Sequence, residues 1–191
     1  GFVIHHVYGN QFQQQKWGAI PDFAVARLSR LIPLYWFFLL VFLTLSPMGT
    51  ILFTHENAWL LLPYALAVTT WWPFSIDGIL LGQWRYYGIS WSIATEIFFY
   101  VCYGLFLYRI CYVKHVATCA ALLAAVLIGS FALMLVLFLT RDTWDLLVQS
   151  ANPSLPPRTQ DFNNSTYRWL LYLSPYGQIW AFIAGALTCQ L

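Results

Sequence analysis

The chain has 191 residues, of which 60% are hydrophobic and 19% aromatic, and only 8% are charged. A soluble domain carries about 25% charged residues because its surface faces water, so this composition excludes an ordinary soluble globular protein. The apolar residues lie in long blocks, which favour a lipid bilayer as the solvent. The net charge of +2 gives no indication of nucleic-acid binding. We therefore expect an integral membrane protein.

The first polar segment, residues 5–30, is expected to be an aqueous loop that ends in a short amphipathic helix. It contains three residues that favour breaks in a helix: Gly9, Gly18 and Pro21. An apolar span of residues 31–46 follows, with Pro33 in its first turn, where a missing N–H group costs little.

Four further apolar segments are expected to span the membrane: residues 58–74, 91–112, 117–139, and 169 to the end of the chain, the last interrupted by Pro175 and Gly177. Each segment is close to the ~20 residues that a helix needs to cross ~30 Å of hydrocarbon. Residues 140–167 are polar and are expected to form a loop. Strict apolar–polar alternation, which a membrane barrel requires, is absent. The predicted fold is all-α, a polytopic transmembrane bundle of about five spans.

The basic residues give two possible orientations. The first loop carries three bases and is expected in the cytoplasm, because Lys and Arg are enriched in cytoplasmic loops. If every span crosses the membrane, Arg109 and Lys114 lie outside and residues 140–167 lie inside, which is the arrangement we favour. If residues 58–74 enter and leave on one side, the two bases move inside and the long segment moves outside.

The four cysteines lie in or beside apolar segments, and we expect them to be small packing residues in helices. They are Cys102, Cys111, Cys119 and Cys189. Their spacing lacks the CxxC pairs and His clusters that are typical of metal sites and disulfide frameworks, so neither is indicated.

A carboxylate lies inside an apolar run at residues 90–100, SWSIATEIFFY. If the helix begins near Ser92, Glu96 lies within about its first turn, where the helix dipole and free N–H groups stabilise an anion at low cost. Alternatively, Glu96 faces the bundle interior and binds a proton or a polar substrate, as ionisable residues in spans usually do. Helical spacing places Ser92, Glu96 and Tyr100 on one face.

A second group of ionisable residues lies immediately before the first span, in FAVARLSRLIPLYW. Arg27 and Arg30 are three residues apart and therefore share a helical face. They are either positive-inside anchors that meet anionic headgroups or a clamp for phosphate, which guanidinium groups bind bidentately.

The chain resembles the acyltransferase 3 family of membrane O-acyltransferases from end to end. The opening GFVI is similar to the end of a family span. The residues that match the two main family motifs and the later span are Phe23, Arg27, Arg30, Pro33 and Tyr35, then Trp91, Ser92, Glu96, Phe99 and Tyr100, then Pro175, Phe182 and Gly185. The resemblance implies a single membrane-embedded domain over residues 1–191, truncated at both ends, in the inner or plasma membrane.

The resemblance also implies an activity and a set of site residues. The family transfers an acyl group, often acetyl, from acyl-CoA to a hydroxyl of a carbohydrate or envelope glycan. Glu96, Ser92 and Tyr100 would be catalytic, and Arg27 and Arg30 would bind the phosphates of the acyl-CoA donor. The presumed catalytic histidine of the family lies on a span before Gly1, so the piece is expected to be inactive alone. His5 and His6 are interpreted as ordinary loop histidines.

Two other classes of membrane protein fit part of the pattern. A secondary transporter of a polar solute would explain a buried carboxylate and spans broken by Pro63, Pro175 and Gly177, although no internal repeat is visible. A purely structural or receptor-like module would use Glu96 and the arginines only as anchors.

Overall fold

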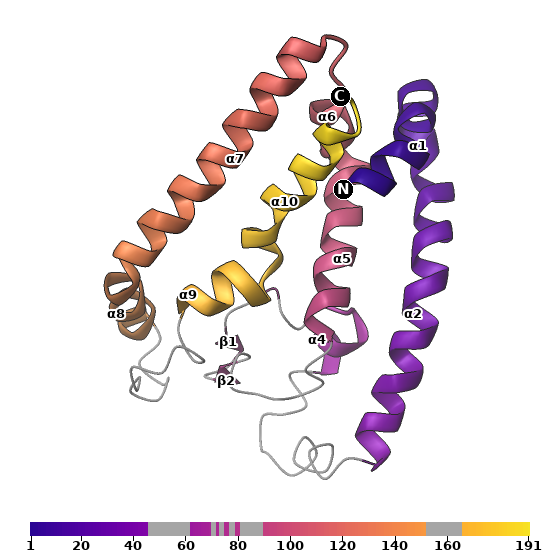
Figure 1. Cartoon of the computed structure of the whole chain (residues 1–191). Helices are drawn as coiled ribbons and strands as arrows, with labels where there is room; N and C mark the ends of the chain where they lie inside the picture. Colours follow the sequence, from indigo (N-terminus) through magenta and orange to yellow (C-terminus); the bar gives the residue numbers. More distant parts are fainter. Residues whose placement is uncertain (46–61, 70–71, 73–74, 77–78, 81–89, 152–165) are drawn as a thin grey trace.

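The computed structural model describes residues 1–45, 62–69, 72, 75–76, 79–80, 90–151 and 166–191, and it is helical apart from one short strand pair (Figure 1). The helical elements are α1 (Phe2–Gln15), η1 (Lys16–Gly18), α2 (Ala19–Leu45), α4 (Leu62–Leu66), α5 (Ser90–Cys102), η3 (Tyr103–Leu107), α6 (Tyr108–Cys111), α7 (Val116–Leu139), α8 (Arg141–Ala151), α9 (Thr166–Arg168), η5 (Trp169–Leu173) and α10 (Pro175–Thr188). Strands β1 (Ser75–Ile76) and β2 (Ile79–Leu80) pair antiparallel. The all-α class is confirmed.

The prediction of an aqueous loop over residues 5–30 is wrong. This segment forms α1, the 3₁₀ turn η1 and the first part of α2, which begins 12 residues before the expected start of the span. Pro21 lies in the first turn of α2, where the N–H group that proline lacks has no partner within the helix. The chain changes direction at Lys16, whose φ is +50°.

Pro33 lies inside α2 and not in the first turn of a span. An interior proline removes one helical hydrogen bond, but membrane helices tolerate this when neighbouring groups satisfy the freed carbonyl. The position of Pro33 therefore did not mark a helix start.

The central spans match the sequence closely. Residues 90–111 form one continuous helical segment, α5–η3–α6, in which η3 is a π-helical turn. Helix α7 begins one residue before the expected span and ends where expected. All four cysteines are free thiols, and three of them, Cys102, Cys111 and Cys119, are buried. The Cys119 Sγ–H donates to the carbonyl of Leu187 on α10 at 3.2 Å.

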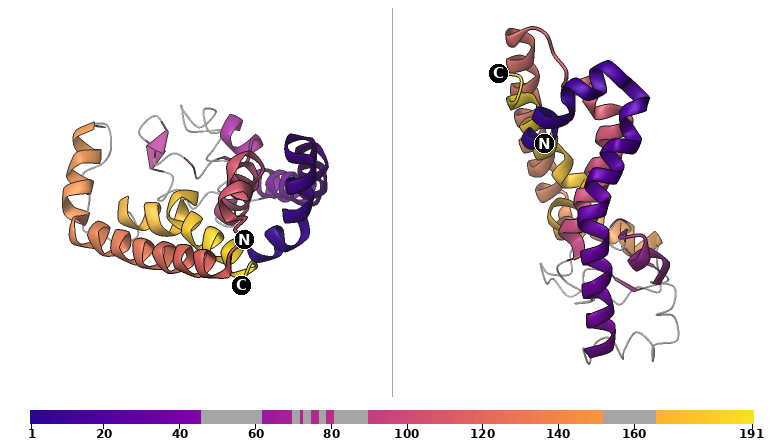
Figure 2. Two further views of the ribbon diagram at one scale, coloured as in Figure 1. Left: turned by 90° about the horizontal axis from the view of Figure 1, so that it is seen from above. Right: turned by 90° about the vertical axis from the view of Figure 1, so that its right-hand side faces the viewer.

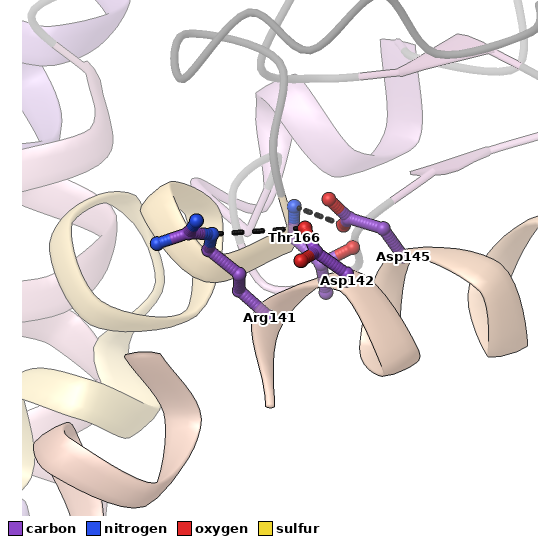
Figure 3. Close-up of polar contacts among 4 residues, drawn as sticks. All are labelled: Arg141, Asp142, Asp145 and Thr166. Atoms are coloured by element: carbon purple, nitrogen blue, oxygen red, sulfur yellow. Dashed lines mark hydrogen bonds and ion pairs between the residues drawn. The ribbon is translucent and has the colours of Figure 1, made fainter. Parts of the chain in front are cut away.

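The polar segment after α7, which was expected to form a loop, begins as an amphipathic helix, α8. The centre of the expected loop, residues 152–165, lies outside the described residues. Asp145 on α8 accepts a hydrogen bond at 3.0 Å from the backbone N–H of Thr166, the first residue of α9, and so ties α8 to the last helical segment (Figure 3). That segment is interrupted at Ser174, whose ψ of 153° is extended, before Pro175 starts α10. The expected break at Pro175 is confirmed, whereas Gly177, the other expected interruption, lies inside α10.

Four helical segments among the described residues are long and apolar enough to cross a membrane: Phe2–Leu45, Ser90–Cys111, Val116–Leu139 and Thr166–Thr188. The expected span at 58–74 is described only at residues 62–69 and 72. Its described part contains α4, which ends at Leu66 and is followed by a turn in which Val68 has a φ of +58°.

The long helices form an open arc when the bundle is seen from above (Figure 2). Helix α7 packs against α10, α10 against α1 and α5, and α5 against α2. An aromatic core joins α1, α2 and η3, where the ring of the fully buried Phe12 lies 5.4 Å from those of both Phe23 and Tyr103. The rigid seam between α2 and α5 carries the candidate site.

The structure contradicts the favoured orientation. The Arg109 guanidinium lies 5.3 Å from the centroid of the Trp17 ring, so α6 and η1 lie at the same end of the bundle. Helix α2 then runs away from this end, and α5 returns to it (Figure 1). Because η1 and α6 share one end of the bundle, the C-terminal end of α2 and the N-terminal end of α5 share the other end, as the alternative arrangement requires.

Candidate functional site

A half-open pocket of about 270 Å³ lies in the seam between α2 and α5. Five residues of α2 and five of α5–η3 line it, and both sets follow the spacing i, i+3, i+4, i+7, i+8 of one helical face. They are Ile20, Phe23, Ala24, Arg27 and Leu28 on α2, and Ile97, Tyr100, Val101, Gly104 and Leu105 on α5–η3. The lining is apolar except for Arg27 and Tyr100, so the pocket fits an uncharged chain with polar groups placed at one end.

Arg27 is the cation of the pocket. Its guanidinium lies over two aromatic rings, 4.8 Å from the centroid of Tyr8 and 5.8 Å from that of Tyr100. Its Nε atom is buried and has no hydrogen-bond partner among the described residues. A buried N–H group without a partner costs free energy, so this atom is an unsatisfied donor in the pocket wall.

Glu96 reaches the pocket through Tyr100. The Tyr100 hydroxyl donates a hydrogen bond to Oε1 of Glu96, one turn earlier on α5. Tyr100 is buried and lines the pocket, whereas Glu96 is half-buried behind it. The carboxylate is therefore bound to a protein side chain at the pocket wall.

The position of Glu96 in α5 argues against a simple dipole site. Helix α5 begins at Ser90, two residues earlier than expected, which makes Glu96 its seventh residue. The free N–H groups that stabilise an anion belong to the first four residues of a helix. The hydrogen bond from Tyr100 is thus the interaction that accounts for this carboxylate.

Not all the expected site residues come together. Arg27, Tyr100 and Glu96 do, but Ser92 is exposed one turn before Glu96. Arg30 is exposed on α2 and does not line the pocket, although it shares a helical face with Arg27 by spacing.

The interpretation of His5 as a loop histidine is wrong. His5 lies in α1 with only 2% of its surface exposed. Its Nδ1 atom lies 2.9 Å from the Tyr103 hydroxyl, and its Nε2 atom bonds to the side-chain amide of Gln190. His6, by contrast, is exposed and stacks on Phe2. Gly9 lies against the His5 ring, where an added Cβ atom would be 3.4 Å from the nearest ring atom. The four-residue spacing of His5 and Gly9, which is one helical turn, is the only sign of this packing that the sequence contains.

Comparison of the chain with known protein families, with curated proteins and with solved structures finds no match.

Proposed function

We propose that the chain is part of an integral-membrane O-acyltransferase that transfers an acyl group, with acetyl as the simplest case, from acyl-CoA to a hydroxyl of a carbohydrate or envelope glycan. The observation that carries the proposal is the pocket in which the buried, unpaired Nε of Arg27 lies beside the Tyr100–Glu96 pair. An apolar pocket with a cation and a carboxylate at its wall would suit an acyl thioester and the group that reacts with it.

In this reaction the acceptor oxygen attacks the thioester carbonyl. A C–O bond forms, the C–S bond breaks, the acceptor proton passes to a base, and the CoA thiolate leaves and is protonated. Arg27 would donate to the carbonyl oxygen, on which negative charge develops, since donors placed there lower the barrier. Tyr100 and Glu96 would orient the acceptor hydroxyl or the base that deprotonates it.

The proposal is tested by Glu96→Gln in the full-length protein, assayed in membranes with radiolabelled acetyl-CoA and the acceptor glycan. The substitution keeps the shape of the side chain but removes its charge, and we expect transfer to fall by about 10²-fold or more. Asp142→Asn is the matched control, because Asp142 is an exposed carboxylate on α8 that does not line the pocket. Unchanged transfer in Glu96→Gln, with the control also active, would leave Glu96 a structural residue.

A secondary transporter is the second candidate function, and the broken last span favours it. Ser174 interrupts the helical segment between η5 and α10, and interrupted helices line the binding sites of many transporters. The same assay separates the two. A transporter would move solute across sealed vesicles without releasing CoA, whereas an acyltransferase consumes the thioester.

A further inference from the structure

The wall of the pocket continues beyond its apolar lining toward one end of the bundle. On α2 the lining starts at Ile20, and three and four residues before it lie Trp17 and Lys16. On η3 it ends at Leu105, and three and four residues after it lie Tyr108 and Arg109. Lys16 and Trp17 lie in the turn η1 immediately before α2, and Tyr108 and Arg109 lie in α6 directly after η3, so the four residues lie next to this end of the seam.

Arg109 contacts both Trp17 and Tyr108, and Lys16 precedes Trp17 in η1; we name these four residues the basic-aromatic cluster. The Arg109 guanidinium lies 5.3 Å from the Trp17 centroid, and its Nε–H donates to the Tyr108 hydroxyl at 2.9 Å. Trp17, Lys16 and Arg109 are exposed, while Tyr108 is buried. The two aromatic contacts fix the guanidinium in place.

Arg109 carries no counter-charge. Within the described residues its terminal amino groups have no hydrogen-bond partner and no carboxylate in ion-pair range. A guanidinium that is oriented by rings and keeps both terminal groups open matches the geometry that binds phosphate bidentately. The indole face beside it suits stacking with a planar base.

The two subsites lie at different heights along α2, as the two ends of one extended ligand would. Arg27 lies eight residues into α2 from Ala19, which corresponds to about 12 Å along the helix axis. A coenzyme A thioester carries its reactive carbonyl at one end, its phosphates and adenine at the other, and a long uncharged pantetheine arm between them. The pocket lies along the seam between Arg27 and the end of the bundle that carries Arg109, which is the path that such an arm would follow.

We propose that the basic-aromatic cluster, Lys16, Trp17, Tyr108 and Arg109, is the subsite for the nucleotide phosphates of the CoA donor. This inference rests on the proposed function. It assigns the phosphates to Arg109 and Lys16, and leaves Arg27 to the thioester carbonyl. Arg30, which the sequence paired with Arg27, does not take part.

The test is the dissociation constant of coenzyme A for the full-length protein in nanodiscs of neutral phosphatidylcholine. Arg109→Gln should weaken binding about tenfold or more, as expected for the loss of a charge-assisted phosphate contact. Arg109→Lys keeps the positive charge but loses the planar guanidinium that binds phosphate bidentately, so it should retain part of the affinity for coenzyme A. This intermediate affinity distinguishes a lost phosphate contact from misfolding or altered topology. Arg141→Gln is the matched control, because Arg141 also lies over an aromatic ring, 4.9 Å from the Phe138 centroid, and begins α8, which lies at the opposite end of the bundle from α6 (Figure 1).

The outcomes separate the subsite from the proposed function. If the wild-type protein binds no CoA and consumes no thioester, the proposed function fails. If it binds CoA and Arg109→Gln binds equally tightly, only the subsite is overturned. The last measurement repeats the CoA titration in nanodiscs that contain anionic phosphatidylglycerol. CoA affinity that is insensitive to the lipid supports a nucleotide site, whereas displacement of CoA by the anionic lipid would make the cluster a headgroup anchor and overturn the inference.

Discussion

Arg109 on α6 lies over the indole ring of Trp17 in η1, with 5.3 Å between the guanidinium carbon and the ring centroid. This contact joins two segments that are far apart in the sequence and places them at one end of the bundle. It therefore determines which chain segments emerge on the same side of the membrane, which the distribution of basic residues alone left open.

The topology can be tested with single cysteines. Lys16→Cys and Lys114→Cys should be labelled by a membrane-impermeant maleimide from one side of sealed vesicles. Asp142→Cys, at the start of α8 with 88% of its side chain exposed, should be labelled from the other side. Unsubstituted protein is the control for the natural cysteines. Labelling of positions 16 and 114 from opposite sides would restore simple alternation of the spans.

The two adjacent histidines should differ sharply in their effect on stability. His5→Ala removes the partner of the Tyr103 hydroxyl and of the Gln190 amide, and an unsatisfied buried polar group costs about 1–3 kcal/mol. His6→Ala removes an exposed ring and should change the free energy of unfolding little. Unfolding of the purified protein in detergent, followed by circular dichroism, measures both. Equal stability of the two variants would contradict the buried position of His5.

The break before α10 requires glycine at position 177. A Cβ atom at Gly177 would lie 2.3 Å from the backbone carbonyl oxygen of Leu170, which cannot move without η5. Gly177→Ala should therefore destabilise the protein by about 1–3 kcal/mol or more, the usual cost of overpacking.

Gly129→Ala is the control for that substitution, because a Cβ at Gly129 meets nothing within 4 Å. It should be neutral or slightly stabilising, since alanine favours helix more than glycine does. The thermal unfolding midpoints of the two variants give the comparison. A Gly177→Ala protein as stable as the Gly129→Ala protein would show that η5 and α10 do not approach so closely.

The pair of Glu96 and Tyr100 should act as one unit in catalysis. Tyr100→Phe removes the donor to the carboxylate and should lower acyl transfer, and the double variant with Glu96→Gln should be little worse than Glu96→Gln alone. Tyr176→Phe, a tyrosine change on α10 away from the pocket, is the control. Strictly additive losses in a double-mutant cycle, read as turnover in membranes, would mean that the two side chains act independently.

The sequence alone determined the features that depend on local spacing and on solvent. The apolar blocks fixed the all-α membrane class and the limits of α5–α6 and α7 to within about two residues, because a helix must satisfy its own backbone in lipid. The i, i+4 spacing of Glu96 and Tyr100 placed them together for the same reason, since neighbours on one helix face need no other element.

The tertiary structure decided everything that requires contact between distant segments. It buried His5 against Tyr103, made residues 5–30 helical, and brought Arg109 to Trp17. It also separated Arg27 from Arg30, because only the side of α2 that faces α5 forms the pocket. Periodicity gives the face of a helix but not its partner, and a polar residue at the end of a span can equally meet water, lipid or another helix. The packing of α1, α2 and α5 makes that choice.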